Sequence, residues 1–450
     1  MKSLFTSCIL LFLTSGLFSQ NIASFLKDTL DKTFDLQFSN AGDKGMVAAL
    51  YFPDGSSWTK AGGYQGTTML SADMIYQVGS NTKTFVAALI MMLRDEGKLG
   101  LEDTIYQFIP PLAHVDGRIT VKQLLQHTSG VYNYTDHPSF AGNLNLGLSV
   151  FWTPDTVLDN YLNPADFSPG TSWKYSNTGY LLLGKIIESV EGKPLNQVLK
   201  DRIFTPYNFG EIYLGAYDST TKPMPGTWLS MSNYLSSDVT SVISSAWAAG
   251  AILSHPVQLA KWAYDLYGGK IVSSNSLTEM TTASALSGGS YGLGTINRRM
   301  DGILYHGHGG SILHYSAMDY STQSNFGCVA ISIDASKTNQ SLVHDALIKV
   351  VEARIADAPD PTLGFSEADK DNSFQVFPNP ASDFIQIRSE SVGISKVRVR
   401  QLNGQVVLDK ELDLSSSQLD VSALENGLYM LHIVGLEGKQ IFGKRLLIAK

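Results

Sequence analysis

Ser80 and Lys83 are the first pair of residues whose types and spacing could do chemistry. Three residues along a helix make about one turn, so the amine of Lys83 can return to the hydroxyl of Ser80. A hydroxyl is a weak nucleophile unless a neighbouring base takes its proton, and a lysine that burial keeps neutral can act as that base. The pair therefore predicts nucleophilic catalysis by Ser80.

The surroundings of Ser80 favour it over three other Ser-x-x-Lys pairs. A strand-like run over 74–78 precedes it, apolar residues at helical spacing follow it, and Gly97 stands where a helix C-cap is expected. Of the other pairs, one lies just after the possible signal-peptide cut that follows Ser19, one adjoins a hairpin turn and one runs into a proline. They are Ser24/Lys27, Ser57/Lys60 and Ser219/Lys222. The alternative for Ser80 is the common role of a helix-start serine.

Tyr175 and Asn177 form the second candidate, after the turn at 169–170 and before a helical run. On extended backbone, residues i and i+2 point the same way, which suits a phenol that relays protons beside an amide that orients a substrate. The same pattern recurs at Tyr161 and Asn163, where a proline follows and no helix does. The alternative for Tyr175 is a half-buried packing tyrosine.

The third candidate is the segment His308-Gly309-Gly310-Ser311 on a late predicted strand. Glycines allow a substrate backbone to approach the strand edge, and the imidazole of His308 can bind an anionic or polar group. The N–H of Ser311 can supply half of an oxyanion hole. This segment is therefore predicted to bind the substrate.

Two rival sites receive less support from the residues around them. His306, His308 and His314 could be metal ligands, but no constellation of Asp, Glu or His at a recognised spacing completes the set, so no metal is expected. Residues 288–292 fit the Gly-x-Ser-x-Gly elbow of α/β-hydrolases, which needs a strand before it and a helix after it. Residues 283–287 make a poor strand, and the glycines at 292–294 disfavour a helix.

The helical and strand patterns that must position these residues predict an α/β sandwich, in which helices flank a mainly antiparallel sheet. Helical patterns occupy 22–38 and the segment around 342–351, and strand patterns occupy 45–52, 302–306, 315–319 and 326–333. The region from about 130 to 240 is rich in Tyr, Asn, Pro and Gly, which predicts an irregular lobe inserted into the more regular body.

The composition places the chain among globular proteins. Its 450 residues are 44% hydrophobic and 16% charged, enough for two or three domains. The formal net charge is −8, and no basic cluster could follow a phosphate backbone, so nucleic acid is not an expected partner.

Residues 1–19 have the pattern of a secretory signal peptide, with Lys2 near the start, an apolar run over 9–13 and small residues before a cut after Ser19. No later stretch reaches the roughly 18 apolar residues of a membrane span. The one remaining cysteine, Cys328, excludes an internal disulfide and lies in an apolar strand pattern, which predicts a buried structural role.

A second domain follows a linker over 357–375 that is rich in Asp, Pro, Glu and Lys. Short alternating strands fill 376–450, and Asn403-Gly404 is a strong hairpin signal, so this domain is predicted to be a small β-sandwich. An immunoglobulin-like accessory module is the alternative identity for it. No chemical site is visible in this segment.

The three candidate motifs, in the order in which they occur, resemble those of the serine β-lactamase and penicillin-recognising hydrolase family. Ile119–Gly130 and the stretch Pro169–Tyr180, the most specific passage, carry the resemblance further. They are similar to the branch that contains class C β-lactamases, D-Ala-D-Ala carboxypeptidases and related esterases. The likeness runs from about Ile22 to Ala356 and implies a β-lactamase/transpeptidase-like domain over 20–356.

This resemblance implies that Ser80 attacks the carbonyl of a small molecule or peptide and forms an acyl-enzyme, without a cofactor. Lys83 and Tyr175 would share the proton transfers, and which of them is the acylation base stays open. The implied substrate-binding residues are Asn177, His308, Gly310 and Ser311. His308 stands where class C β-lactamases have lysine, which points to a carboxypeptidase or esterase. A non-catalytic module that binds peptidoglycan peptides or penicillin is the alternative.

Residues 376–450 resemble the C-terminal sorting domain of the type IX secretion system. The resemblance rests on Phe377–Ala381, on Asn426–Tyr429 and on the basic pair Lys444-Arg445. It implies that the type IX secretion machinery is a partner of this chain. The chain would pass through the periplasm and outer membrane of a Gram-negative bacterium, and the protein would be secreted or held at the cell surface.

Overall fold

The structure is a computed structural model that describes residues 21–145, 147–230, 232–235, 239–358, 374–379, 381–389, 394–401, 406–411, 417–435 and 440–450. The predicted signal peptide and most of the predicted linker lie outside these residues, as does the Asn403-Gly404 turn. The chain divides into two compact units, one over Leu26–Ile355 and the other containing Ala356–Lys450.

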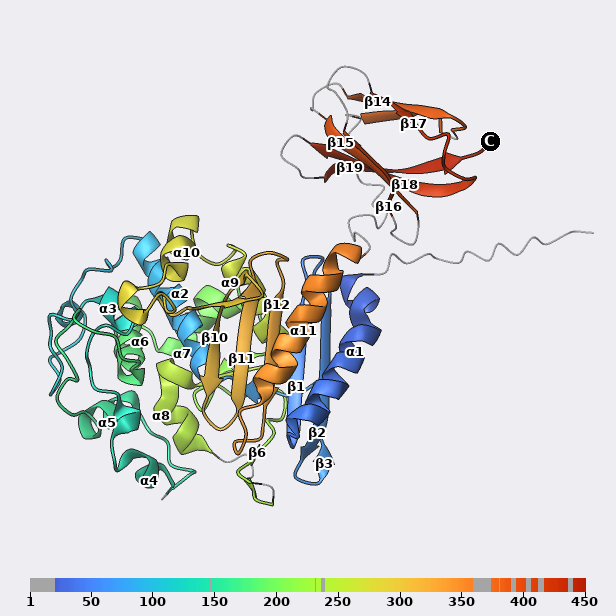
Figure 1. Cartoon of the computed structure of the whole chain (residues 1–450). Helices are drawn as coiled ribbons and strands as arrows, with labels where there is room; N and C mark the ends of the chain where they lie inside the picture. The colour runs from blue at the N-terminus through green and yellow to red at the C-terminus, as the bar shows by residue number, and fades with distance from the viewer. Residues whose placement is uncertain are drawn as a thin grey trace, which may run out of the picture. The chain divides into compact units, whose positions relative to one another are not determined.

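A seven-stranded antiparallel sheet forms the centre of the first unit (Figure 1). From edge to edge its strands are β3 (Thr68–Met69), β2 (Ser57–Gln65), β1 (Gly45–Tyr51), β12 (Gly327–Ser332), β11 (Tyr315–Ser321), β10 (Ile303–Ser311) and β9 (Ile296–Met300). The central strands β1 and β12 are buried almost throughout, because helices cover both faces of the sheet.

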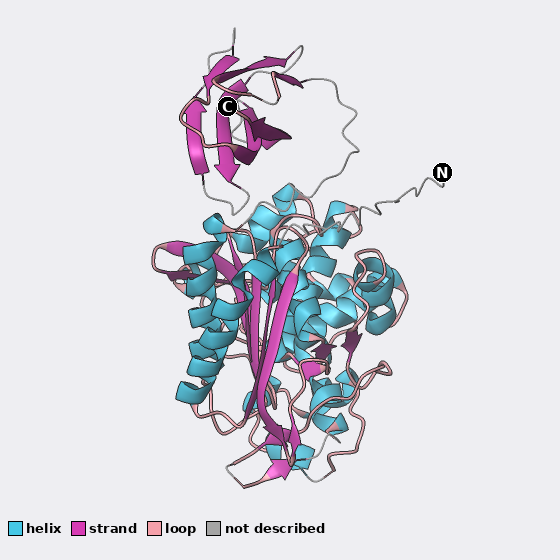
Figure 2. Ribbon diagram, turned by 90° about the vertical axis from the view of Figure 1, so that its right-hand side faces the viewer, coloured by secondary structure: helices cyan, strands magenta, loops and turns pink. Residues whose placement is uncertain are grey.

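Helices pack on both faces of this sheet, which Figure 2 shows nearly edge-on. On one face lie α1 (Ile22–Ala41) and α11 (Gln340–Arg354), and on the other lies α9 (Pro256–Tyr267). Trp58 Nε1 of β2 donates a hydrogen bond to Asp31 Oδ1 of α1 over 2.9 Å. The remaining helices are α2 (Thr82–Asp95), α3 (Val121–Leu125), α4 (Phe140–Asn145), α5 (Pro154–Asn160), α6 (Asn177–Glu191), α7 (Leu195–Leu199), α8 (Thr240–Gly250) and α10 (Ser274–Thr281).

Two small sheets complete the first unit. One orders β4 (Tyr76–Gln77), β8 (Ile252–Ser254) and β5 (Ile212–Leu214), and the other pairs β6 (Thr227–Trp228) with β7 (Tyr234–Leu235). The predicted irregular lobe is confirmed in outline, since short helices and loops occupy most of 130–240 (Figure 1).

Helix α2 runs through the interior of the first unit. Every residue from Thr82 to Met91 is buried, and Phe85 stacks on Trp262 of α9 with 3.9 Å between ring centroids. A helix that is apolar on all sides must be surrounded by protein, and α6 and α8 pack against α2 in this way. Lys83 therefore enters the core along with its helix.

The structure corrects three details of the predicted elements. Ser80 does not begin α2 but lies in a separate single turn before it, so it is no N-cap of that helix. Asn177 is not on extended backbone, because α6 begins there. Leu342, the first apolar residue of the helical pattern predicted around 342–351, is 47% exposed, because Val343, Leu347 and Val351 carry the buried face of α11 instead.

The second unit contains two antiparallel sheets around one apolar cluster, which agrees with the predicted β-sandwich. One sheet orders β13 (Phe374–Phe377), β14 (Phe384–Ser389) and β17 (Ser417–Asp420). The other orders β16 (Val406–Glu411), β15 (Ile394–Gln401), β18 (Gly427–Gly435) and β19 (Gln440–Ile448). Ile385 of the first sheet and Val397 of the second are fully buried in the shared cluster.

Among the helices that the structure describes, none combines the length and the apolar character needed to cross a membrane.

Two adjacent glycines of β10, Gly309 and Gly310, differ in how closely other atoms pack against them. A Cβ on Gly310 would overlap the backbone oxygen of Val78, whereas the nearest atom to a Cβ on Gly309 is Ser316 O at 3.7 Å. We expect Gly310→Ala to lower the free energy of unfolding by about 1–3 kcal/mol through overpacking. Gly309→Ala should change it by less than about 0.5 kcal/mol.

Urea denaturation of both variants, followed by near-ultraviolet circular dichroism, measures the difference. Equal stabilities for the two variants would contradict the packing described for β10.

Candidate active site

A single 3-10 turn, Gly79–Asn81, holds Ser80 between β4 and α2. Gly79 has φ +52°, and a Cβ there would lie 2.8 Å from Ser311 N, so glycine lets the turn approach the end of β10. Asn81 Nδ2 donates to Ser316 Oγ over 2.7 Å and to Val78 O over 2.8 Å, which ties the turn to β11. The turn that carries Ser80 is thereby held against the end of β10.

Lys83 lies one turn further along, with its side chain fully buried. Its Nζ is 3.0 Å from Ser80 Oγ, 2.8 Å from Asn177 Oδ1 and 2.7 Å from the backbone oxygen of Ala249. The helix-turn geometry expected from the Ser-x-x-Lys spacing is thus present. Asn177 begins α6 and Ala249 lies in α8, so three separate segments meet at this amine.

The three partners of Lys83 define what its neutral form can do. Burial lowers the pKa of Lys83 well below its ordinary value, because an ammonium ion loses its hydration in the core. A neutral amine has two N–H donors and one lone pair. Asn177 Oδ1 and Ala249 O can only accept, so they take the two donors and leave the lone pair facing the hydroxyl of Ser80.

Tyr175 also lies close to this amine. Lys83 Nζ is 4.8 Å from the centroid of the Tyr175 ring. Burial raises the pKa of Tyr175 above its ordinary value, and a hydrogen bond with the Ser80 side chain partly opposes that rise. The phenol is therefore protonated at neutral pH and contacts the hydroxyl of Ser80, so Lys83 and Tyr175 both reach the candidate nucleophile.

The amide of Asn177 is already engaged within the protein. Its Oδ1 accepts from Lys83, its Nδ2 donates to Thr135 Oγ1 over 3.3 Å, and its backbone N–H donates to Asn133 Oδ1 over 2.9 Å. The expected role in orienting a substrate is therefore accompanied by a role in holding the lysine.

His308 of β10 is buried, and both of its ring nitrogens have protein partners. Nε2 is 3.0 Å from the hydroxyl of Tyr291, and Nδ1 is 2.5 Å from Gly309 O. Burial first, and then the neighbouring Lys83, lower the pKa of His308 to about 3, so the ring is neutral. A neutral ring that donates from Nδ1 accepts at Nε2. An anionic substrate group would have to displace Tyr291 and would meet no charge.

The other two residues of this segment lie at the turn that carries Ser80. Gly310 faces the backbone of Val78, so the space that its missing side chain leaves is filled by protein rather than left for a substrate. This differs from the reason expected for the glycine. Ser311 is exposed and its N–H lies beside Gly79, where it can contribute to an oxyanion hole with the N–H of Ser80.

Three residues of this site were not predicted from the sequence. Ala249 contributes only its backbone oxygen, which no side-chain pattern can show. Tyr291 was part of the rejected elbow, and His127 was part of a motif without an assigned role. A centroid distance of 4.2 Å separates the rings of His127 and Tyr175, and one of 4.7 Å separates those of His127 and Tyr291.

The rival sites lack this geometry. Ser290 of the elbow pattern is exposed, follows a 3-10 turn rather than a strand and precedes no helix. The lysines of the other Ser-x-x-Lys pairs are each paired with at least one carboxylate. These ion pairs are Lys27 with Asp31, Lys60 with Asp35, and Lys222 with Asp73 and Glu211.

The three histidines considered as metal ligands have separate protein partners. His306 Nδ1 is 2.7 Å from Asn297 Oδ1, and His314 Nδ1 accepts from the backbone N–H of Gln77 over 3.3 Å. The partners of His308 are Tyr291 and Gly309.

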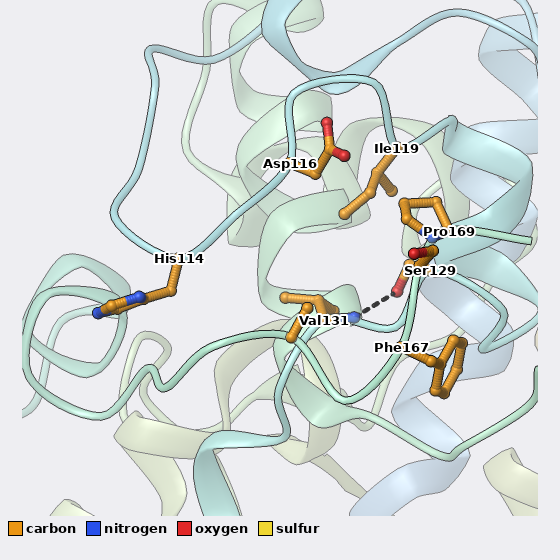
Figure 3. Close-up of a pocket in the computed structure, with 9 residues that line it drawn as sticks. His114, Asp116, Ile119, Ser129, Val131, Phe167 and Pro169 are labelled. Carbon is orange, nitrogen blue, oxygen red and sulfur yellow. Dashed lines mark hydrogen bonds between the residues drawn. The ribbon is translucent and has the colours of Figure 1, made fainter.

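A hollow of about 310 Å³ is lined by residues from two segments of the chain, 114–131 and 165–169 (Figure 3). Ser129, Val131, Phe167 and Pro169 line it, and Ser129 Oγ accepts the backbone N–H of Val131 over 3.3 Å. Ser80 and Lys83 are not among its lining residues, so the hollow is separate from the candidate nucleophile.

Two family models match the chain. The model described as Beta-lactamase matches residues 31–334, and the model described as Secretion system C-terminal sorting domain matches residues 375–449. The first match includes every candidate site residue named above. The second coincides with the small β-sandwich.

Individual proteins give a consistent result. The chain is 30% identical over 223 residues to the putative penicillin-binding protein PbpX of Bacillus subtilis, which is 49% of this chain and 52% of that protein. It is 28% identical over 165 residues to a putative D-alanyl-D-alanine carboxypeptidase of Escherichia coli, covering 33% of this chain and 37% of that protein. The chain thus spans about half the length, or less, of these curated relatives.

A solved structure covers more of the fold. The crystal structure of a D-stereospecific amidohydrolase from Streptomyces sp. superposes with a TM-score of 0.63 and 28% identity, over 70% of this chain and 97% of that one.

The lowered pKa of Lys83 predicts how the reactivity of Ser80 depends on pH. The amine is neutral above its lowered pKa and protonated below it. We therefore expect the rate at which a fluorophosphonate labels Ser80 to fall as the pH is lowered. Lys83→Arg keeps a cation at every pH and should reduce the rate by about 10²–10⁴-fold.

Intact-protein mass spectrometry at a series of pH values measures the labelling rate. Lys60→Arg, in one of the rejected pairs, is the matched control and should react like the wild type. A rate that did not change with pH, or a reactive Lys83→Arg variant, would refute the role of the neutral amine.

Proposed function

Because the chain belongs to the beta-lactamase family over residues 31–334, we propose that it is a secreted serine hydrolase that cleaves amide or ester bonds through an acyl-enzyme on Ser80. The observation that carries this proposal is the buried Lys83 amine 3.0 Å from Ser80 Oγ, with its two N–H donors already directed to Asn177 and Ala249. That arrangement supports proton transfer from the serine to the lysine.

In the first half of the reaction, Ser80 Oγ attacks the substrate carbonyl while its proton moves to Lys83 Nζ. The N–H groups of Ser80 and Ser311 stabilise the oxyanion. The proton then passes to the leaving amine or alcohol, directly or through the Tyr175 phenol, as the carbonyl–leaving group bond breaks. Water repeats the sequence on the acyl-enzyme, and the acid is released as Ser80 regains its proton.

Which of Lys83 and Tyr175 acts as the acylation base is part of the proposal. The protonated phenol of Tyr175 can donate to a leaving group but cannot accept until it has lost its proton, and burial opposes that loss. The neutral Lys83 needs no such step. We therefore assign Lys83 as the base for acylation and Tyr175 as the donor to the leaving group.

The substrate class follows from the site together with the relatives. The names of the similar proteins refer to penicillin binding, to D-alanyl-D-alanine carboxypeptidase and to D-stereospecific amide hydrolysis. We propose a carboxypeptidase-like or esterase-like activity on a carbonyl next to a D-configured centre. The neutral His308 could hold the carboxylate of a carboxypeptidase substrate only by a hydrogen bond, after displacing Tyr291, so it favours an ester or amide without a charged group at that end of the site. A non-catalytic binding module is the alternative, and covalent labelling of Ser80 separates the two.

The C-terminal unit belongs to the secretion-system sorting domains over residues 375–449. This match supports export of the hydrolase by the type IX machinery, to the cell surface or beyond, with the periplasm as the route.

Ser80→Ala removes the proposed nucleophile. We expect it to lower the hydrolysis of p-nitrophenyl acetate by at least about 10³-fold, because the acyl-enzyme can no longer form. Release of p-nitrophenol measures the rate. Ser290→Ala, which alters the exposed serine of the rejected elbow, should keep the wild-type rate. Full activity in Ser80→Ala would refute the assignment.

A panel of substrates tests the proposed class. The mature protein should hydrolyse D-phenylalanine amide or an acyl-D-Ala-D-Ala peptide at least about tenfold faster, by kcat/KM, than the L-configured counterpart. Chromatography of the products measures both rates. Equal rates for the two configurations would reject the D-specific part of the proposal while leaving the hydrolase in place.

A further inference from the structure

We propose that His127 is a positioning residue that holds Tyr175 against Ser80 by accepting the backbone N–H of Ser176. This inference rests on the proposed function, since it concerns the same site. His127 lies in the segment 119–130, and it takes no part in the proton transfers assigned to Lys83 and Tyr175.

Two hydrogen bonds join His127 to the segment on both sides of Tyr175. The backbone N–H of Lys174 donates to His127 O over 3.1 Å, and the backbone N–H of Ser176 donates to His127 Nδ1 over 3.2 Å. Because the bonded residues are the two neighbours of Tyr175 in the chain, they fix the backbone from which the phenol projects. His127 therefore acts on Tyr175 through the backbone.

The hydrogen bond to Ser176 also determines the tautomer of the ring. A nitrogen that accepts carries no proton, so the proton of the neutral His127 lies on Nε2. That atom is buried and has no hydrogen-bond partner among the residues that the structure describes. Within the described part of the chain, the bond at Nδ1 is thus the one hydrogen bond that orients the ring. Burial, and then Lys83 and His308, lower the pKa of His127, which keeps Nδ1 free to accept.

The backbone conformation of His127 also indicates that its surroundings hold it in place. Its φ is +61°, in the left-handed region that non-glycine residues seldom adopt. Such a conformation is kept only where the surroundings enforce it. Here it accompanies a side chain that is only 1% exposed and is turned toward Ser176.

The ring and the acceptor of His127 are two separable features. The ring packs on Tyr175, Tyr180 and Tyr291, with centroid distances of 4.2, 5.4 and 4.7 Å. The Nδ1 acceptor holds Ser176. Because the proposed role belongs to the Nδ1 acceptor, an informative comparison uses two variants that both lack the ring and both allow the positive φ, and that differ only in the acceptor.

His127→Asn and His127→Gly form a matched pair for this purpose. Both residues tolerate a positive φ, and both lack the ring, but only asparagine places an oxygen where Nδ1 accepts. We expect His127→Asn to keep kcat for p-nitrophenyl acetate within about threefold of the wild type. His127→Gly should lower kcat at least about tenfold and change KM less, since a misplaced catalytic group lowers the rate of the chemical step.

Amide hydrogen exchange at Ser176 reports the contact without using activity. The amide should be protected in the wild type and in His127→Asn, and should exchange at least about tenfold faster in His127→Gly. Equal exchange and equal kcat in the two variants would overturn the proposal.

A double-mutant cycle with Tyr175→Phe separates positioning from a general structural role. If His127 acts through Tyr175, adding His127→Gly to Tyr175→Phe should lower kcat only slightly further, because the phenol is already absent. In the Tyr161→Phe background, which alters the tyrosine of the rejected pattern, His127→Gly should lower kcat by the same factor as in the wild type. An undiminished cost in the Tyr175→Phe background would overturn the proposal. An inactive wild type that Ser80-directed reagents leave unlabelled would instead overturn the proposed function.

Discussion

Removing the Lys83 amine from water is the physical step on which the rest of the site depends. An ammonium ion in the core would cost several kcal/mol of hydration, so burial favours the neutral base. That burial requires α2 to be covered on every side, which is why α6, α8 and α9 all pack around it. The two carbonyl oxygens at Nζ, from Asn177 and Ala249, then aim the remaining lone pair at Ser80.

Close contact between backbones is the second constraint. Gly79 and Gly310 lack side chains at the point where the turn that carries Ser80 meets the end of β10. Asn81 and Ser316 fasten the same contact through hydrogen bonds. The turn itself is not part of the central sheet, so these contacts hold the late strands β10 and β11 beside an early segment of the chain. The N–H groups of Ser80 and Ser311, which we propose bind the oxyanion, can therefore be preorganised.

Around Ser80 the titratable side chains are predominantly neutral. Burial lowers the pKa of Lys83, His127 and His308 and raises that of Tyr175. The site therefore holds protons that can be exchanged, without the fixed charges that would bind an ionic ligand tightly. This suits acyl transfer between uncharged partners. The sorting domain, by contrast, is a separate folding unit with its own apolar cluster, so export and hydrolysis reside in different parts of the chain.

The sequence alone was sufficient for local features, including the Ser80–Lys83 pair, the antiparallel body, the irregular lobe and the C-terminal β-sandwich. These depend on side-chain types and on spacings of a few residues, which determine periodicity and turns. It was insufficient for partners contributed by the backbone or by distant segments, such as Ala249 O on the amine, Val78 O against Gly310, or Tyr291 on His308. It predicted that His308 would bind an anionic or polar group and that Gly310 would leave room for a substrate, whereas Tyr291 contacts the His308 ring and Val78 O fills the space at Gly310. Only tertiary packing decides which groups lose water and which gaps the protein itself fills, because both depend on contacts between residues far apart in the chain.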